Sequence, residues 1–317
     1  MTCLALLWWG TLVLESYGWT LFVLLPVALG GAIGFLVEKA SEGLAVGLAV
    51  VAFSVSGMLV LGFEGLICIL MAAPLVLVLA LIGAALARWV LPRSHGGKTL
   101  ILLFAALPFL MAFEKEVAPE PPLYSVRTAV TIDAPPDVVW EQVVSFSEIP
   151  PPEDWIFKTG LAYPIHARIE GTGVGAIRYC EFSTGAFVEP IEVWDAPRLL
   201  RFAVTENPPP MEEWNPFAET HPPHLDQFLV SRRGQFLLEP LPGGGTRLEG
   251  TTWYQHGLWP ATYWRWWSDA IIHRIHSRVL DHVGRLAESR TRAASSPPDA
   301  SLDSTGPEDR RSRLVDL

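Results

Sequence analysis

The sequence predicts an α+β fold in which an antiparallel sheet wraps around a long C-terminal helix, preceded by a transmembrane α-helical bundle. The helix is predicted over Pro260 to Leu286, where apolar residues recur every three or four positions. The sheet is predicted from upstream segments in which apolar and polar residues alternate, because such a sheet could cover the apolar face of that helix. The bundle is predicted from the first 113 residues, which carry only four basic and four acidic residues.

Charge and cysteine content narrow the classes of function. The net charge of -10 lies entirely beyond residue 113, in an acidic part without a basic run, so nucleic acid is not an expected partner. The cysteines Cys3, Cys68 and Cys180 form no metal-binding pair, and only Cys180 lies in the acidic part, which therefore has no internal disulfide. We expect no metal and no cofactor.

Residues 1–115 are predicted to form about four membrane spans. Three apolar stretches reach the roughly 20 residues that cross a bilayer: Tyr17 to Val37, Leu44 to Phe63 and Leu66 to Leu91. A fourth, Thr99 to Phe113, is shorter, but charged residues bracket it on both sides. The opening run Leu4 to Leu14 is too short to cross.

Basic residues in the short connections predict the orientation of these spans. Lys39 lies between the first and second spans, and Arg93 and Lys98 lie between the third and fourth. Because cytoplasmic connections carry the excess of basic residues, we expect a multi-pass protein of the cell membrane whose water-soluble part is extracytoplasmic. The span interiors lack charges, so an anchoring bundle is favoured over a channel or pump.

The rest of the chain divides into a linker, a domain and a tail. Pro and Glu dominate the linker, residues 116–123, and the predicted domain covers residues 124–288. The domain opens with a strand over Tyr124 to Ile132 and a helix that begins after Pro135 and Pro136. Residues 289–317 are rich in Ser, Pro, Asp and Arg and are predicted to be disordered.

Several further strands follow the opening helix. Gly171, Gly173 and Gly175 predict a tight hairpin. The predicted strands after it are Ala176 to Phe182, Phe187 to Val193, Leu199 to Val204, Phe228 to Pro240 and Thr246 to Gln255. The long proline-rich connection Glu206 to Asp226 is typical of a lid.

Five sequence segments carry a resemblance to a known superfamily. They are Val130-Thr-Ile-Asp-Ala-Pro-Pro-Asp-Val-Val-Trp-Glu, Gly173-Val-Gly-Ala-Ile-Arg-Tyr, Glu189-Pro-Ile-Glu-Val-Trp-Asp-Ala-Pro-Arg, Gly244-Gly-Thr-Arg-Leu-Glu-Gly and the terminal helix. Over roughly Leu123 to Ala287 the chain resembles the helix-grip fold of the START/Bet v 1-like (SRPBCC) superfamily, also described as polyketide cyclase/dehydrase and lipid-transport domains. The resemblance implies a cavity between the sheet and the C-terminal helix, but it says little about the ligand.

Aromatic and polar residues near the expected cavity are the candidate site. The expected ligand-binding residues are Trp155, Tyr179, Glu181, Trp253, Trp264 and Trp267. Glu181 and His256 are the candidate catalytic groups, because a carboxylate or imidazole in an apolar pocket can act as an acid or base. His221, His224 and Asp226 form no metal-binding pattern and indicate a solvated loop, and His273 and His276 indicate the wet face of the terminal helix.

Three classes of function remain open at this point. The favoured one is a membrane-anchored domain that binds a hydrophobic small molecule or lipid in a cavity between the sheet and the C-terminal helix. The second is a cyclase or dehydratase that acts on a polyketide-like ligand through Glu181 or His256. The third is a structural or sensing module whose cavity is filled by its own side chains. The sequence indicates no protein partner and no oligomeric state.

Overall fold

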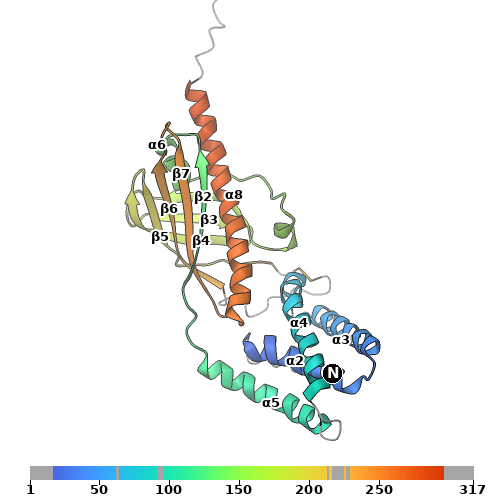
Figure 1. The fold of residues 1–317 in the computed structure, drawn as a ribbon. Helices are drawn as coiled ribbons and strands as arrows, with labels where there is room; N and C mark the ends of the chain where they lie inside the picture. Colours follow the sequence, from blue (N-terminus) through green and yellow to red (C-terminus); the bar gives the residue numbers. More distant parts are fainter. Residues whose placement is uncertain are drawn as a thin grey trace, which may run out of the picture.

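The computed structural model describes residues 17–61, 64–90, 96–212, 214–215, 225 and 229–295, and consists of a group of apolar helices and a sheet domain (Figure 1). Several predictions lie outside these residues. They concern the opening run Leu4 to Leu14, Cys3, Arg93, most of the lid with His221, His224 and Asp226, and the tail beyond residue 295.

In the described part of the chain, four apolar helical segments precede the sheet domain. They are η2 (Thr20–Leu24) continued by α2 (Leu25–Leu36), then α3 (Ala40–Val60), α4 (Leu66–Val90) and α5 (Gly96–Val117). Three of them, over Ser41–Val60, Leu66–Val90 and Gly96–Val117, are long and apolar enough to cross a membrane. The predicted first span is the short one, Thr20–Leu36, whereas the stretch around Pro108 forms a full 22-residue helix.

Small residues bring α2 and α4 into backbone contact. A Cβ atom placed on Gly30 would lie 1.8 Å from the carbonyl oxygen of Ala80, and one on Gly83 would lie 2.1 Å from that of Val27. Helices inside a membrane gain much of their association energy from such close packing. Hydrogen bonds also join η2 to α5, because the carboxylate of Glu114 accepts hydrogen bonds from the backbone N–H groups of Trp19 and Thr20.

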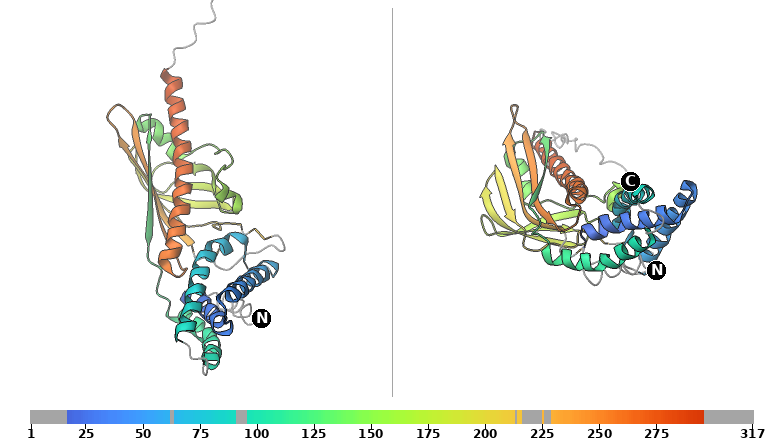
Figure 2. Two further views of the ribbon diagram at one scale, coloured as in Figure 1. Left: turned by 45° about the vertical axis from the view of Figure 1, so that its right-hand side comes forward. Right: turned by 60° about the horizontal axis from the view of Figure 1, so that its bottom comes forward.

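The second body is a seven-stranded antiparallel sheet in the order β1-β7-β6-β5-β4-β3-β2 (Figures 1 and 2). Its strands are β1 (Tyr124–Ile132), β2 (Pro164–Glu170), β3 (Ile177–Phe182), β4 (Gly185–Asp195), β5 (Leu199–Ala203), β6 (Leu229–Pro240) and β7 (Thr246–His256). Helices α6 (Pro136–Val144) and η3 (Trp155–Thr159) lie between β1 and β2, and the long α8 (Ala261–Ser295) follows β7. The sheet curls around α8 (Figure 2), which is the helix-grip arrangement predicted from the sequence.

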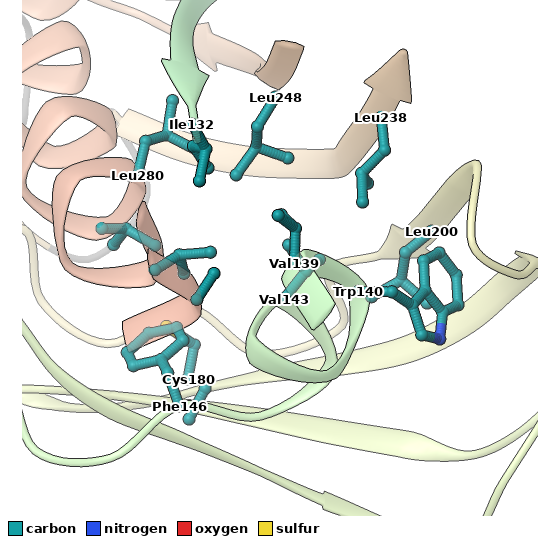
Figure 3. Close-up of a cluster of buried hydrophobic side chains, with 14 of the residues drawn as sticks. Ile132, Val139, Trp140, Val143, Phe146, Cys180, Leu200, Leu238, Leu248 and Leu280 are labelled. Carbon is teal, nitrogen blue, oxygen red and sulfur yellow. The ribbon is translucent and has the colours of Figure 1, made fainter. Parts of the chain in front are cut away.

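The core of this domain lies where α6 and α8 meet the inner face of the sheet. Leu280 of α8, Val139 of α6 and Leu248 of β7 are fully buried there (Figure 3). The opening strand and helix occupy the predicted residues because Val126, Thr128 and Ile132 alternate inward, and Pro136 suits the first helical turn.

Helix α8 continues to Ser295, so the expected disorder from residue 289 is wrong for residues 289–295. Side chains support these last turns. Arg290 forms an ion pair with Glu141 of α6 at 2.7 Å, and the Thr291 hydroxyl donates to the carbonyl oxygen of Ala287. The composition of this segment favoured disorder, whereas contact with α6 and continuity with the buried turns of α8 favour the helix.

We predict that Gly30→Ala destabilises the helical body, because its methyl group would collide with the Ala80 carbonyl. Overpacking of this kind costs about 1–3 kcal/mol. Gly31→Ala is the matched control, since its nearest neighbour would lie at 3.7 Å, an ordinary contact distance. Thermal unfolding in detergent should show a lower midpoint for Gly30→Ala alone, and equal midpoints would contradict the close packing.

Candidate functional site

A large cavity lies where the apolar helices meet the sheet domain. Its volume is about 1010 Å³, at the upper end of the range of roughly 300–1,000 Å³ found for small-molecule sites. One wall comes from α2, α3 and α4, through residues such as Leu29, Val51 and Leu77. The other comes from the sheet domain, through Met211, Leu225, Leu229, Leu258, Trp264, Trp267, Ser268 and Ile271. The cavity is therefore shared by both bodies.

The two walls are held together by direct contacts. Trp264 and Ile271 of α8 pack in one apolar cluster with Ile67 and Met71 of α4. The Tyr263 hydroxyl donates to the carbonyl oxygen of Met71, and the backbone N–H of Leu66 donates to the carbonyl oxygen of Trp214 at 3.0 Å. These contacts place the first turns of α8 on α4.

Few polar groups line the large cavity, and they differ between its two ends. Near the sheet domain, Glu64 accepts a hydrogen bond from the Tyr17 hydroxyl at 3.3 Å. At the other end, Arg88, which lies 24 residues further along the chain, also lines the cavity and donates to the carbonyl oxygens of Gly34 and Val37. At about 1.5 Å of rise per residue, this span of chain corresponds to roughly 36 Å, close to the thickness of a bilayer.

The second cavity lies inside the sheet domain, between the sheet and α8, and measures only about 120 Å³. The expected cavity for an apolar ligand at this place is therefore largely filled. An ion pair between Arg178 and Glu189 occupies it, and the guanidinium carbon lies 5.5–5.6 Å from the ring centres of Phe146, Phe202 and Phe236. A lipid chain does not fit in the remaining space.

The buried ion pair shifts the acid–base properties of its neighbours. For Arg178, burial opposes the charged form, but attraction to the Glu189 carboxylate outweighs it and the pKa is raised. Burial also raises the pKa of Glu189, against the opposing attraction of Arg178. The Cys180 thiol has a pKa raised to about 12, first by burial and then by the Glu189 charge, so it stays protonated at neutral pH.

A hydrogen-bonded group of histidines joins α8 to the sheet beside this inner cavity. The Thr128 hydroxyl of β1 lies 2.8 Å from Nδ1 of His273 and 3.1 Å from Nδ1 of His276. Nε2 of His276 lies 2.7 Å from the Thr252 hydroxyl of β7. Burial lowers the pKa of His276 to about 4, and the neighbouring His273 adds to this effect. The expectation that both histidines form a wet face is therefore wrong for His276, which lines the inner cavity.

The structure brings only two of the predicted site residues to a cavity. Trp264 and Trp267 line the large cavity. Trp155 is 64% exposed on η3, and Trp253, Tyr179 and Glu181 line neither cavity. His256 is buried but stacks on Tyr124 instead, at 5.1 Å between ring centres, and it also lines neither cavity.

The predictions for Tyr179 and Glu181 are corrected by the way that side chains alternate between the two faces of β3. Arg178, Cys180 and Phe182 point inward, so Tyr179 and Glu181 occupy the outer face, where the guanidinium of Arg168 lies 3.9 Å from the Tyr179 ring centre. Successive strand residues point to opposite faces, so one wrong choice of face misplaces the whole strand. The apolar pair Cys180 and Phe182 was the available signal for the inward face. Arg178 and Glu189 themselves were missed because charged residues are rarely fully buried.

Among the described residues, no group of three or more His, Cys, Asp or Glu side chains is placed to hold a metal ion.

Comparisons with known proteins find likeness at the level of structure alone. No family model matches the chain, and no curated protein matches it in sequence. The Zhui aromatase/cyclase from Streptomyces sp. R1128 is 19% identical with a TM-score of 0.38, over 56% of this chain and 100% of that one. A point mutant of norcoclaurine synthase from Thalictrum flavum is 12% identical with a TM-score of 0.37, over 55% and 99%. A protein from Nitrosospira multiformis is 15% identical with a TM-score of 0.34, over 53% and 99%.

We predict that acid destabilises the sheet domain through His276. Its folded pKa of about 4 lies below the ordinary 6.5, so between these values the unfolded chain binds the proton and the folded chain does not. The contribution of His276 to the free energy of unfolding is fully present above pH 6.5 and is lost as the pH falls toward 4. About 2 kcal/mol of it is lost at pH 5. His276→Gln should flatten the dependence of the unfolding midpoint between pH 7.5 and 5, and an unchanged slope would contradict the assignment.

Proposed function

We propose that this chain is a multi-pass membrane protein that binds a lipid or another apolar small molecule in the large cavity. The observation that carries the proposal is the cavity itself, which is about 1010 Å³ in volume, predominantly apolar and walled by both bodies. Small-molecule sites are concave and mainly apolar, with a few polar groups that fix orientation, and Glu64 and Arg88 are such groups here.

The surroundings of the cavity favour a ligand that comes from the bilayer. Helices α3, α4 and α5 expose large apolar side chains, among them Phe53, Leu81 and Phe109. A chain that leaves lipid for this cavity gains little hydrophobic free energy, because both surroundings are apolar. Shape and the polar groups at the two ends would therefore select the ligand.

The charges and tryptophans support an extracytoplasmic position for the sheet domain. Lys39 and Arg88 lie at the helix ends far from the domain, where basic residues are typical of the cytoplasmic side. Trp214, Trp259 and Trp266 are exposed near the contact between the domain and the helices, a place typical of tryptophan at a membrane interface.

The positions of the candidate catalytic residues do not support the alternative of a cyclase or dehydratase. Glu181 and His256, its two candidate acid–base groups, line neither cavity. The filled-cavity alternative fits the inner cavity but leaves the large one unexplained. Binding is therefore the function we propose.

Blocking the large cavity should remove its ligand. Val51 of α3 lines the cavity, whereas Val46 lies on the same helix outside it and is 40% exposed. We expect Val51→Trp to lower the amount of co-purified apolar ligand severalfold in native mass spectrometry of the full chain, and Val46→Trp to leave it unchanged. Wild-type protein without ligand, or equal loss in both variants, would contradict the proposal.

The proposed orientation can be read by cysteine labelling in intact cells. A membrane-impermeant maleimide should label Glu170→Cys, at the end of β2, and should not label Lys39→Cys until the membrane is permeabilised. The native cysteines are replaced by Ser or Ala in both variants. The reverse pattern would place the sheet domain in the cytoplasm.

A further inference from the structure

We propose that the inner cavity is a second ligand site, which binds a short-chain carboxylic acid through the free edge of the Arg178 guanidinium. This inference does not depend on the proposed function of the large cavity, because the two cavities share no lining residue.

The geometry of Arg178 points to a missing acceptor. The residue is 1% exposed, and its Nη1 group donates to Oε2 of Glu189, its cross-strand neighbour on β4. Its Nε and Nη2 groups have no hydrogen-bond partner in the described part of the chain. These two groups form the edge of a guanidinium whose parallel N–H bonds bind a carboxylate in bidentate fashion.

The side chains around Arg178 leave these two groups unpaired, although the polar residues Ser231, Gln235, Thr251 and Thr252 also line the cavity. The rings of Phe146, Phe202 and Phe236 surround the guanidinium, and Ile275 and Val279 of α8 contribute further apolar surface to the cavity. A buried N–H group without a partner costs free energy, so an occupant that accepts two hydrogen bonds and presents an apolar body would be stabilised here.

The volume limits the size of this occupant. An engineered apolar cavity of about 150 Å³ holds benzene, so the 120 Å³ found here limits an occupant to at most about the six non-hydrogen atoms of benzene. Butyrate has this size and carries both the carboxylate and the short apolar body. A long acyl chain does not fit.

Because of the charges around the cavity, we expect binding of the carboxylate to be accompanied by uptake of one proton. The ionisable side chains that line it are Arg178 and Cys180 of β3, Glu189 of β4, Arg233 of β6 and His276 of α8. Arg233 is exposed and paired with Glu192, so Arg178 and Glu189 form a neutral buried pair. A second carboxylate would leave one uncompensated negative charge in an apolar core. Glu189, whose pKa burial already raises, takes up one proton as the acid binds.

Calorimetric titration of the full chain in detergent tests this site with sodium butyrate as the probe. We expect butyrate to bind with an affinity that falls about tenfold for each pH unit between 6 and 8, as uptake of one proton requires. Octanoate, which is too large, and 1-butanol, which lacks the acceptor pair, should not displace butyrate from this site. Absence of butyrate binding would mean that the cavity holds water only, and would overturn the proposal.

Three variants locate the binding. Glu189→Gln removes the competing charge, so butyrate should bind without pH dependence, and Arg178→Gln should abolish binding. Cys180→Leu fills part of the cavity and leaves the ion pair in place, so it should also abolish binding while thermal unfolding shows a folded protein. If Arg178→Gln or Glu189→Gln does not fold, Cys180→Leu and the pH dependence of the wild-type chain decide. Butyrate binding that survives Cys180→Leu, or a pH dependence unchanged in Glu189→Gln, would overturn the proposal.

Discussion

The contact between the first turns of α8 and the helix α4 determines the shape of the rest of the molecule. Tyr263 donates to the Met71 carbonyl, and Trp264 meets Phe22 of η2 with ring centres 5.0 Å apart. Without this contact, the open end of the sheet domain would face water. With it, that end faces apolar helices, and the large cavity acquires two walls of different origin.

The buried ion pair explains why the large cavity lies at this junction and not inside the sheet domain. A helix-grip fold leaves space between its sheet and its long helix, and here Arg178, Glu189 and three phenylalanine rings take up most of that space. Removing one partner of such a pair would leave an uncompensated buried charge, at a cost of about 3–5 kcal/mol. The space between the sheet and α8 is therefore largely occupied, and the larger cavity lies between Ile271 of α8 and the helices α3 and α4.

The fold could be predicted from the sequence because its signals are local. The period of α8, the alternation in β1 and the prolines before α6 each depend on neighbouring residues, and all three elements lie where expected. The site could not be predicted in the same way. The choice of the inward face of β3 decides between Arg178 and Glu181, and α8 places Trp264 against a helix about 190 residues earlier in the chain. Such long-range contacts have no local signature, and neither has the burial of His276 between β1 and β7.

Photo-crosslinking of the full chain in bilayers, with a fatty acid that carries a diazirine on its chain, measures the central claim most directly. A ligand in the shared cavity should label peptides from both walls, that is α3 or α4 together with Trp264 to Ile271 of α8. Excess unlabelled fatty acid should suppress this labelling more strongly than labelling of the exposed Phe109 on α5. Labelling of α5 and the other exposed helix faces alone, with none on α8, would contradict a ligand site shared by the two bodies.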